Sequence, residues 1–148
     1  MLDELKYRDK KEFDSFGVGF LVEPAMDVDV ENCKRRVLDL FGLNLSSDYI
    51  SILSISDGFS CNGFNLYGSK LRCEPYFIEG ILDINVEFWG EPSLRKYFAY
   101  SQESTTRIVF NMDSGKYEIV DRVSWDELYS FLTLNEALIF NLEDCAIF

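Results

Sequence analysis

The sequence predicts a single α+β domain in which helices pack against a largely antiparallel sheet. The length of 148 residues fits one domain of roughly 100–200 residues. Apolar residues make up 47% of the chain, enough for a packed core. Helical segments fill the first half and strand-like segments the second, without the regular strand–helix alternation that produces a parallel sheet. We therefore expect one domain over residues 1–148, with residues 1–29 as an N-terminal extension.

Two helices are expected in the first 42 residues. The first spans Leu2 to Phe16 and ends where Gly17 and Gly19 interrupt the pattern. Asp29 is a plausible N-cap for the second, and Gly42 a good C-cap. Apolar side chains at helical spacing predict the buried face of this second helix: Val30, Cys33, Val37 and Leu40.

The middle of the chain predicts two more helices around a short strand. Ser46 or Ser47 can cap a helix that ends near Asp57-Gly58. The turn signal Cys61-Asn62-Gly63 then precedes a strand over Phe64 to Tyr67. A further helix is expected from Ile81 to Phe88. The apolar side chains of the capped helix are Tyr49, Ile52, Leu53 and Ile55.

The last third predicts strands followed by two helices. Tyr97 to Tyr100 is strand-like, and the segment from Arg107 to Asp121 is typical of a β-hairpin with Asp113-Ser114-Gly115 in the turn. Ser124 and Glu127 have capping-box spacing, with Val123 and Leu128 placed as a hydrophobic staple. A second box from Thr133 to Glu136 predicts another helix start, with a bend between the two.

Composition excludes several classes of function. The chain has 14 Lys plus Arg against 26 Asp plus Glu, a formal net charge of −12, and no histidine. Without histidine, a Ser-His-Asp triad, a Cys-His pair and a His-ligated zinc site are excluded. The negative charge argues against nucleic acid and anionic membranes as partners and favours a basic one. The alternative explanation of the charge is solubility alone.

Catalytic and targeting motifs are sparse. The acids from Asp27 to Glu31 have the spacing of a cation loop but lack its central glycine, so a helix start is the better interpretation. We expect no catalytic residue, no metal and no cofactor. The mixed-charge N-terminus is not a signal peptide, and no apolar run is long enough to span a membrane. We therefore expect a cytoplasmic protein whose cysteines are reduced thiols: Cys33, Cys61, Cys73 and Cys145.

The acidic residues are unevenly distributed. Residues 12–33, 73–94 and 123–148 contain no Lys or Arg and together hold 16 of the 26 acids. If the middle window is helical, three of its acids form a stripe at i, i+4 and i+8, where like charges destabilise a helix by roughly 0.2–0.5 kcal/mol per pair. The alternatives are a non-helical segment or a stripe that is merely solvated. The candidate partner-binding residues are Glu74, Glu79, Asp83, Glu87 and Glu91.

The order of these motifs resembles the SUKH superfamily, the Syd-like and yeast cell-wall-regulator-like domains common among bacterial immunity proteins. The segment from Leu45 to Gly58, LSSDYISILSISDG, is similar to that family's L-P-x-D-Y-x-x-F-L-x-x-x-N-G helix, with Ser46 for the usual Pro and Asp57 for the usual Asn. The segments that resemble the family's hairpins, central strand and terminal helices are Asn62–Gly68, Tyr97–Tyr100, Asp113–Tyr117 and Trp125–Leu138.

The resemblance covers roughly Val30 to Leu142 and is closest to the YrhA-type branch. It implies an α+β domain without catalysis, an immunity protein that binds a toxin domain and blocks it. Such toxins are often nucleases or deaminases. The family has no catalytic motif to transfer, and its toxin-facing residues vary. Two alternatives remain: a regulatory module that binds a protein or peptide without a toxin, and a small carboxylate-dependent enzyme. The sequence leaves monomer and homodimer open.

Overall fold

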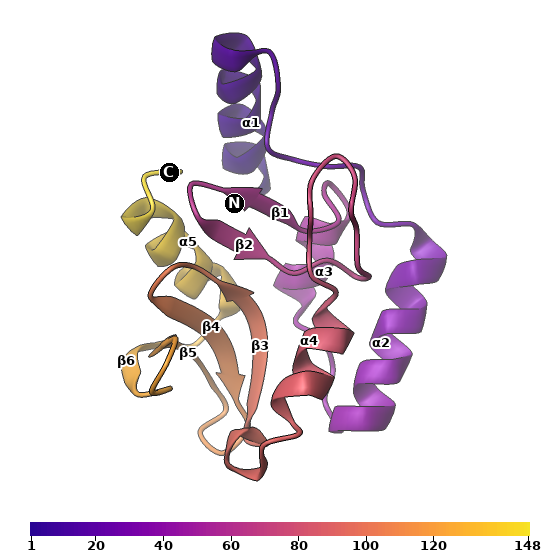
Figure 1. The fold of residues 1–148 in the computed structure, drawn as a ribbon, viewed down its shortest axis with the longest axis vertical. Helices are drawn as coiled ribbons and strands as arrows, with labels where there is room; N and C mark the ends of the chain where they lie inside the picture. Colours follow the sequence, from indigo (N-terminus) through magenta and orange to yellow (C-terminus); the bar gives the residue numbers. More distant parts are fainter.

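A six-stranded antiparallel sheet, with its strands in chain order, runs through the protein (Figure 1). The computed structural model describes all 148 residues. The helices are α1 Leu2–Phe16, α2 Asp27–Phe41, α3 Ser47–Leu53, α4 Ile81–Phe88 and α5 Leu134–Asp144, with a 3₁₀ turn η1 at Pro92–Leu94. The strands are β1 Phe59–Cys61, β2 Phe64–Leu66, β3 Tyr97–Gln102, β4 Thr106–Asn111, β5 Lys116–Asp121 and β6 Glu127–Phe131. The α+β class with helices packed on an antiparallel sheet is therefore confirmed.

One hydrophobic core joins the helices to the sheet. Aromatic rings link α3 to the strands, with the ring centroids of Tyr49 and Tyr100 5.2 Å apart, and those of Tyr100 and Phe98 5.3 Å apart. Leu5 and Phe20 belong to the same cluster, so the N-terminal segment packs on the common core even though α1 projects from it in Figure 1. None of the helices combines the length and the apolar character needed to cross a bilayer.

The helix caps follow local chemistry with two corrections. Ser46 caps α3 by accepting the N–H of Asp48 at 3.2 Å, but this helix ends at Leu53 instead of near Asp57-Gly58. Asp29 does not cap α2, which begins at Asp27 and holds Asp29 inside its first turn. The buried stripe of α2 is Cys33, Val37 and Phe41, whereas the predicted Leu40 is 50% exposed. Because the buried residues of α2 are spaced four apart, Phe41 follows Val37 on the same side of the helix. Its ring contacts that of Trp89 at the end of α4.

The prediction of a helix that begins at the Ser124 capping box is wrong. The Asp121 carboxylate accepts the N–H groups of Val123 and Ser124, which folds the segment into a loop. Trp125 follows with a φ of +64°, and the chain then returns as β6 beside β5. Val123 is 89% exposed, so the predicted staple does not form. The second box is confirmed, because Thr133 accepts the N–H of Glu136 and begins α5.

Tertiary packing explains why the Ser124 signal fails. The indole of Trp125 lies over the sheet, with its ring 5.1 Å from Phe88 and 5.4 Å from Tyr97. The guanidinium of Arg107 lies 5.3 Å from the same indole and 4.7 Å from the Phe88 ring. A helix beginning at Ser124 would require a φ of about −63° at Trp125, where the structure has +64°. The aromatic contacts therefore override the local preference for a helix.

The β3–β4 turn contains a carboxylate that contributes to stability at neutral pH. Burial raises the pKa of Glu103, but hydrogen bonds from Thr105, Thr106 and Ser104 outweigh it and lower the pKa from 4.5 to about 2. The unfolded chain then binds more protons than the folded one between these values, so stability falls as the pH drops from 4.5 toward 2. We expect Glu103→Gln to lose stability at pH 7, with a gap to the wild type that narrows over this acid range. Urea titrations across the range measure it, and a gap independent of pH would contradict the assignment.

Candidate functional site

The five candidate acids lie along one continuous segment, the loop from residue 68 to residue 80, α4, and the turn after it. Glu74 is in the loop and Glu79 near its end, while Glu91 precedes η1. Because α4 begins at Ile81, Glu79 lies outside the helix, and the expected three-residue helical stripe is reduced to Asp83 and Glu87. We call Glu74, Glu79, Asp83, Glu87 and Glu91 together the acidic face.

The charges of the acidic face are not neutralised by neighbours. Glu79 is half-buried and the other four are exposed, and none of the five forms an ion pair. The loop's own cations are engaged elsewhere. Lys70 Nζ lies 2.8 Å from the Asp29 carboxylate, and Arg72 Nη2 lies 3.2 Å from that of Asp57. The segment therefore presents five carboxylates with its two basic side chains already paired.

Apolar side chains are interleaved with these acids. Leu71 and Phe77 on the loop and Val86 on α4 are 50%, 56% and 50% exposed. Aromatic and apolar groups are enriched at the centres of protein interfaces, whereas polar and charged groups form their rims. The combination on the loop and α4 is consistent with a surface that binds another protein.

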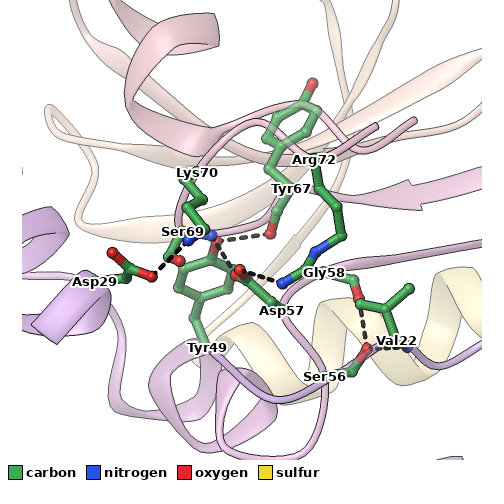
Figure 2. A network of polar contacts seen from close by, with 10 residues as sticks. All are labelled: Val22, Asp29, Tyr49, Ser56, Asp57, Gly58, Tyr67, Ser69, Lys70 and Arg72. Atoms are coloured by element: carbon green, nitrogen blue, oxygen red, sulfur yellow. Dashed lines mark hydrogen bonds and ion pairs between the residues drawn. The ribbon is translucent and has the colours of Figure 1, made fainter. Parts of the chain in front are cut away.

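A buried carboxylate fixes the start of the loop (Figure 2). Asp57 is 1% exposed, and its Oδ1 accepts the N–H of Ser69 at 2.7 Å while Oδ2 pairs with Arg72. Gly68 lies close enough that a Cβ there would be 2.8 Å from the Asp57 carbonyl oxygen. Asp57 thus joins the end of the α3 segment to the first residues of the loop across 12 positions of sequence.

Further polar contacts tie the same region to its surroundings (Figure 2). The Tyr49 hydroxyl on α3 donates to the carbonyl of Tyr67 at 2.6 Å. The Ser56 hydroxyl accepts the N–H of Val22 at 2.9 Å and donates to the carbonyl of Gly58 at 2.6 Å. The segment before α2, the end of α3 and the start of the loop are consequently held in one network.

The loop also has internal pairing. Arg72 and Ile78 exchange both backbone hydrogen bonds, at 3.0 and 2.8 Å, as in a short hairpin. Near the tip, Glu74–Pro75 is a cis peptide, and the Tyr76 hydroxyl donates to the carbonyl of Phe20 and accepts the N–H of Ser60. The hydrogen bonds of Arg72, Ile78 and Tyr76 anchor the loop backbone on both sides of its tip, which lowers the entropy lost when a partner binds.

The chemistry elsewhere in the molecule is limited. No three His, Cys, Asp or Glu side chains gather into a group that would hold a metal ion. Two surface hollows of about 170 and 240 Å³ lie away from the acidic face. Burial, then the charge of Asp57, raises the pKa of Cys33 to about 11, and burial followed by Glu12 does the same for Cys61. These two thiols are therefore protonated at neutral pH and poor nucleophiles.

Sequence reasoning located the acids but missed what holds them. The sequence places Asp57 at a helix end and in the motif that resembles the SUKH superfamily, and nothing nearby in sequence indicates its pairing with Ser69 and Arg72. The only sequence signal for a special backbone here is the glycine of Asp57-Gly58. In the structure this glycine has a φ of +75° and lies against the backbone of Leu66. No family model matches the chain, and a search of the curated proteins finds no match to it.

Proposed function

We propose that this protein binds a basic protein partner through the acidic face, and that it is a cytoplasmic immunity protein that neutralises a bacterial toxin domain by stoichiometric occlusion. The observation that carries the proposal is the set of five carboxylates without an ion pair, interleaved with three exposed apolar side chains on the loop and α4. The resemblance to the SUKH superfamily supports the choice of a toxin as the partner.

The arrangement suits inhibition of an enzyme that acts on nucleic acid. Such an enzyme binds phosphates through Lys and Arg, and an acidic surface can occupy the same basic site. Complementary potentials raise association rates, which favours an inhibitor that must reach its toxin quickly. The net charge of −12 adds a long-range attraction between the whole protein and a basic toxin domain.

Co-expression tests the proposed function. The probe is the C-terminal domain of a toxin encoded beside this gene, produced in a bacterial host with and without the protein. We expect growth to be rescued and a 1:1 complex to elute on gel filtration. Unrescued growth with no complex would overturn the immunity function, and an isolated gene with no adjacent toxin would count for the regulatory alternative.

Charge reversal tests the surface separately. We expect the triple variant Glu79→Lys, Asp83→Lys, Glu87→Lys to bind the toxin domain about 10–10³-fold more weakly, mostly through slower association. The matched control makes the same total charge change at exposed, unpaired acids elsewhere, Asp3→Lys, Asp39→Lys and Asp113→Lys, and should bind far more tightly than the first variant. Stopped-flow association rates distinguish the two. Equal rates for both variants would remove the acidic face from the interface.

A further inference from the structure

The strand β6 is an open edge of the sheet. It pairs with β5 on one side only and ends the strand order, and its first four residues are exposed. The opposite edge is covered, because Leu21 forms a bridge to Phe59 of β1 and the Tyr76 hydroxyl accepts the N–H of Ser60. The backbone of the β1 edge is therefore partly covered, whereas that of the β6 edge is open.

The β6 edge has only part of the usual protection against strand pairing. Soluble proteins blunt exposed edges with charged side chains (especially lysine), with proline, with bulges or with very short strands. β6 has five residues, ELYSF, with no lysine and no proline. Leu128 forms a bulge in its ladder to β5, because Ile119 pairs with Tyr129 and Val120 with Glu127. From Tyr129 to Phe131 the pairing is continuous, and the backbone groups on the outer side of these residues are available to another strand.

An apolar surface adjoins this edge. Leu128 and Tyr129 are each 50% exposed, and Leu132 just after the strand is 75% exposed. The Phe140 ring of α5 lies 4.6 Å from the Tyr129 ring and is itself 36% exposed. A hollow of about 240 Å³, lined in part by Leu132 and Thr133, opens at the end of the strand.

Acids outnumber cations around the edge, where the exposed Lys116 of β5 is an exception. No Lys or Arg occurs from Val123 to the C-terminus, and the nearest cations in sequence are on or beside β5, where Arg122 donates to the carbonyl of Glu103. Exposed acids without an ion pair lie in and beside the strand and in the first turn of α5: Asp126, Glu127 and Glu136. Glu143 and Asp144 lie at the other end of α5, next to Cys145, whose carbonyl accepts a hydrogen bond from Asn62.

We infer that β6 accepts an extended segment of a basic protein as a seventh strand, with apolar side chains on the Leu128–Tyr129 surface and Lys or Arg toward the surrounding acids. Main-chain hydrogen bonds to an open edge supply affinity in this mode of recognition, and alternate side chains supply specificity. None of the residues of this edge belongs to the acidic face, and the inference goes beyond the proposed function.

Charge selects this occupant over a second copy of the chain. Pairing two β6 edges would bring Asp126 and Glu127 of both copies close together in molecules that each carry −12. Like charges placed opposite one another across a strand pair are destabilising. A basic strand meets the same edge with attraction instead of repulsion.

A synthetic octapeptide of alternating valine and lysine tests the inference on the full chain. We expect it to bind and to slow amide hydrogen exchange of β6, whereas a charge-matched peptide with proline in place of valine should not. The variant Leu128→Lys introduces an edge-blocking lysine, and we expect it to weaken binding about tenfold or more. Val123→Lys adds the same charge at an apolar loop position 89% exposed, outside the strand, and should bind nearly as the wild type does.

Each outcome bears on the inference. Equal binding of both peptides, or protection of amides other than those of β6, would show nonspecific charge attraction and overturn it. Dimerisation of the wild type through β6 in sedimentation, abolished by Leu128→Lys, would assign the edge to a second copy instead. Because the assay needs no toxin, loss of this inference leaves the proposed function intact, and rescue of growth by Leu128→Lys would show that the two surfaces act separately.

Discussion

Replacing Asp57 with alanine is expected to lower the free energy of unfolding by about 3 kcal/mol, the lower end of the roughly 3–5 kcal/mol for removing one partner of a buried ion pair. The side chain of Asp57 is 1% exposed, and that of Arg72 is 20% exposed. The substitution leaves the Arg72 guanidinium without its carboxylate and the Ser69 N–H without its acceptor. Partial hydration of Arg72 is the reason for the lower value. Urea unfolding followed by circular dichroism measures the change.

A second ion pair of the same loop is the matched control. Lys70 and Asp29 have side-chain exposures of 52% and 23%, and exposed pairs contribute about 0–1 kcal/mol. We therefore expect Asp29→Ala to cost less than about 1 kcal/mol. Asp57→Asn keeps an acceptor for Ser69 but loses the charge, and should fall between the two. Equal losses for Asp57→Ala and Asp29→Ala would show that the buried network does not hold the loop.

Asn85→Leu is expected to lower the free energy of unfolding by about 2–4 kcal/mol, because two buried backbone groups lose their partners at roughly 1–3 kcal/mol each. Asn85 on α4 is fully buried and binds both sides of the Ala99 peptide. Its Oδ1 accepts the N–H at 2.7 Å, and its Nδ2 donates to the carbonyl at 2.9 Å. The β2–β3 ladder stops at Ser101. The Asn85 side chain therefore supplies hydrogen-bond partners to the backbone of β3 at Ala99, where β2 does not extend.

The exposed neighbour Val86 gives the control for this position. It is 50% exposed on the same helix, and Val86→Ala should change stability by no more than about 0.5 kcal/mol. Amide hydrogen exchange at Ala99 gives a local readout, which should accelerate in Asn85→Leu and remain slow in Val86→Ala. Unchanged exchange at Ala99 would contradict the assigned role of Asn85.

The elements that the sequence predicted well are those decided by nearby residues. The hairpin of β4 and β5 turns at Gly115, whose φ of +71° suits glycine, and the Asn111 side chain accepts the N–H groups of Asp113 and Ser114. The starts of α3 and α5 follow from equally local hydrogen bonds, which the hydroxyls of Ser46 and Thr133 accept from the N–H groups of Asp48 and Glu136. Such interactions depend on spacing in the chain, which a sequence displays directly.

The failures have long-range causes. The sequence predicts a helix where β6 lies, because the capping signal at Ser124 is local, whereas the contacts of Trp125 with Phe88 and Tyr97 join residues that are distant in sequence. The acidic face was located by charge counting, but its geometry depends on Asp57 and Arg72, which lie 15 positions apart. The spacing of apolar, capping and charged residues along a sequence does not indicate contacts between distant positions, and both contacts are visible only in the structure.

The dissociation constant of the complex with the toxin domain, measured at ionic strengths of roughly 0.01 and 0.15 M, tests the central claim most directly. The Debye length falls from roughly 30 to 8 Å between these conditions. If the acidic face binds a basic partner, affinity weakens markedly at the higher salt for the wild type, and the Glu79, Asp83, Glu87 triple lysine variant loses most of that dependence. Absence of a complex, or a dissociation constant that neither salt nor the triple variant changes, would contradict the account.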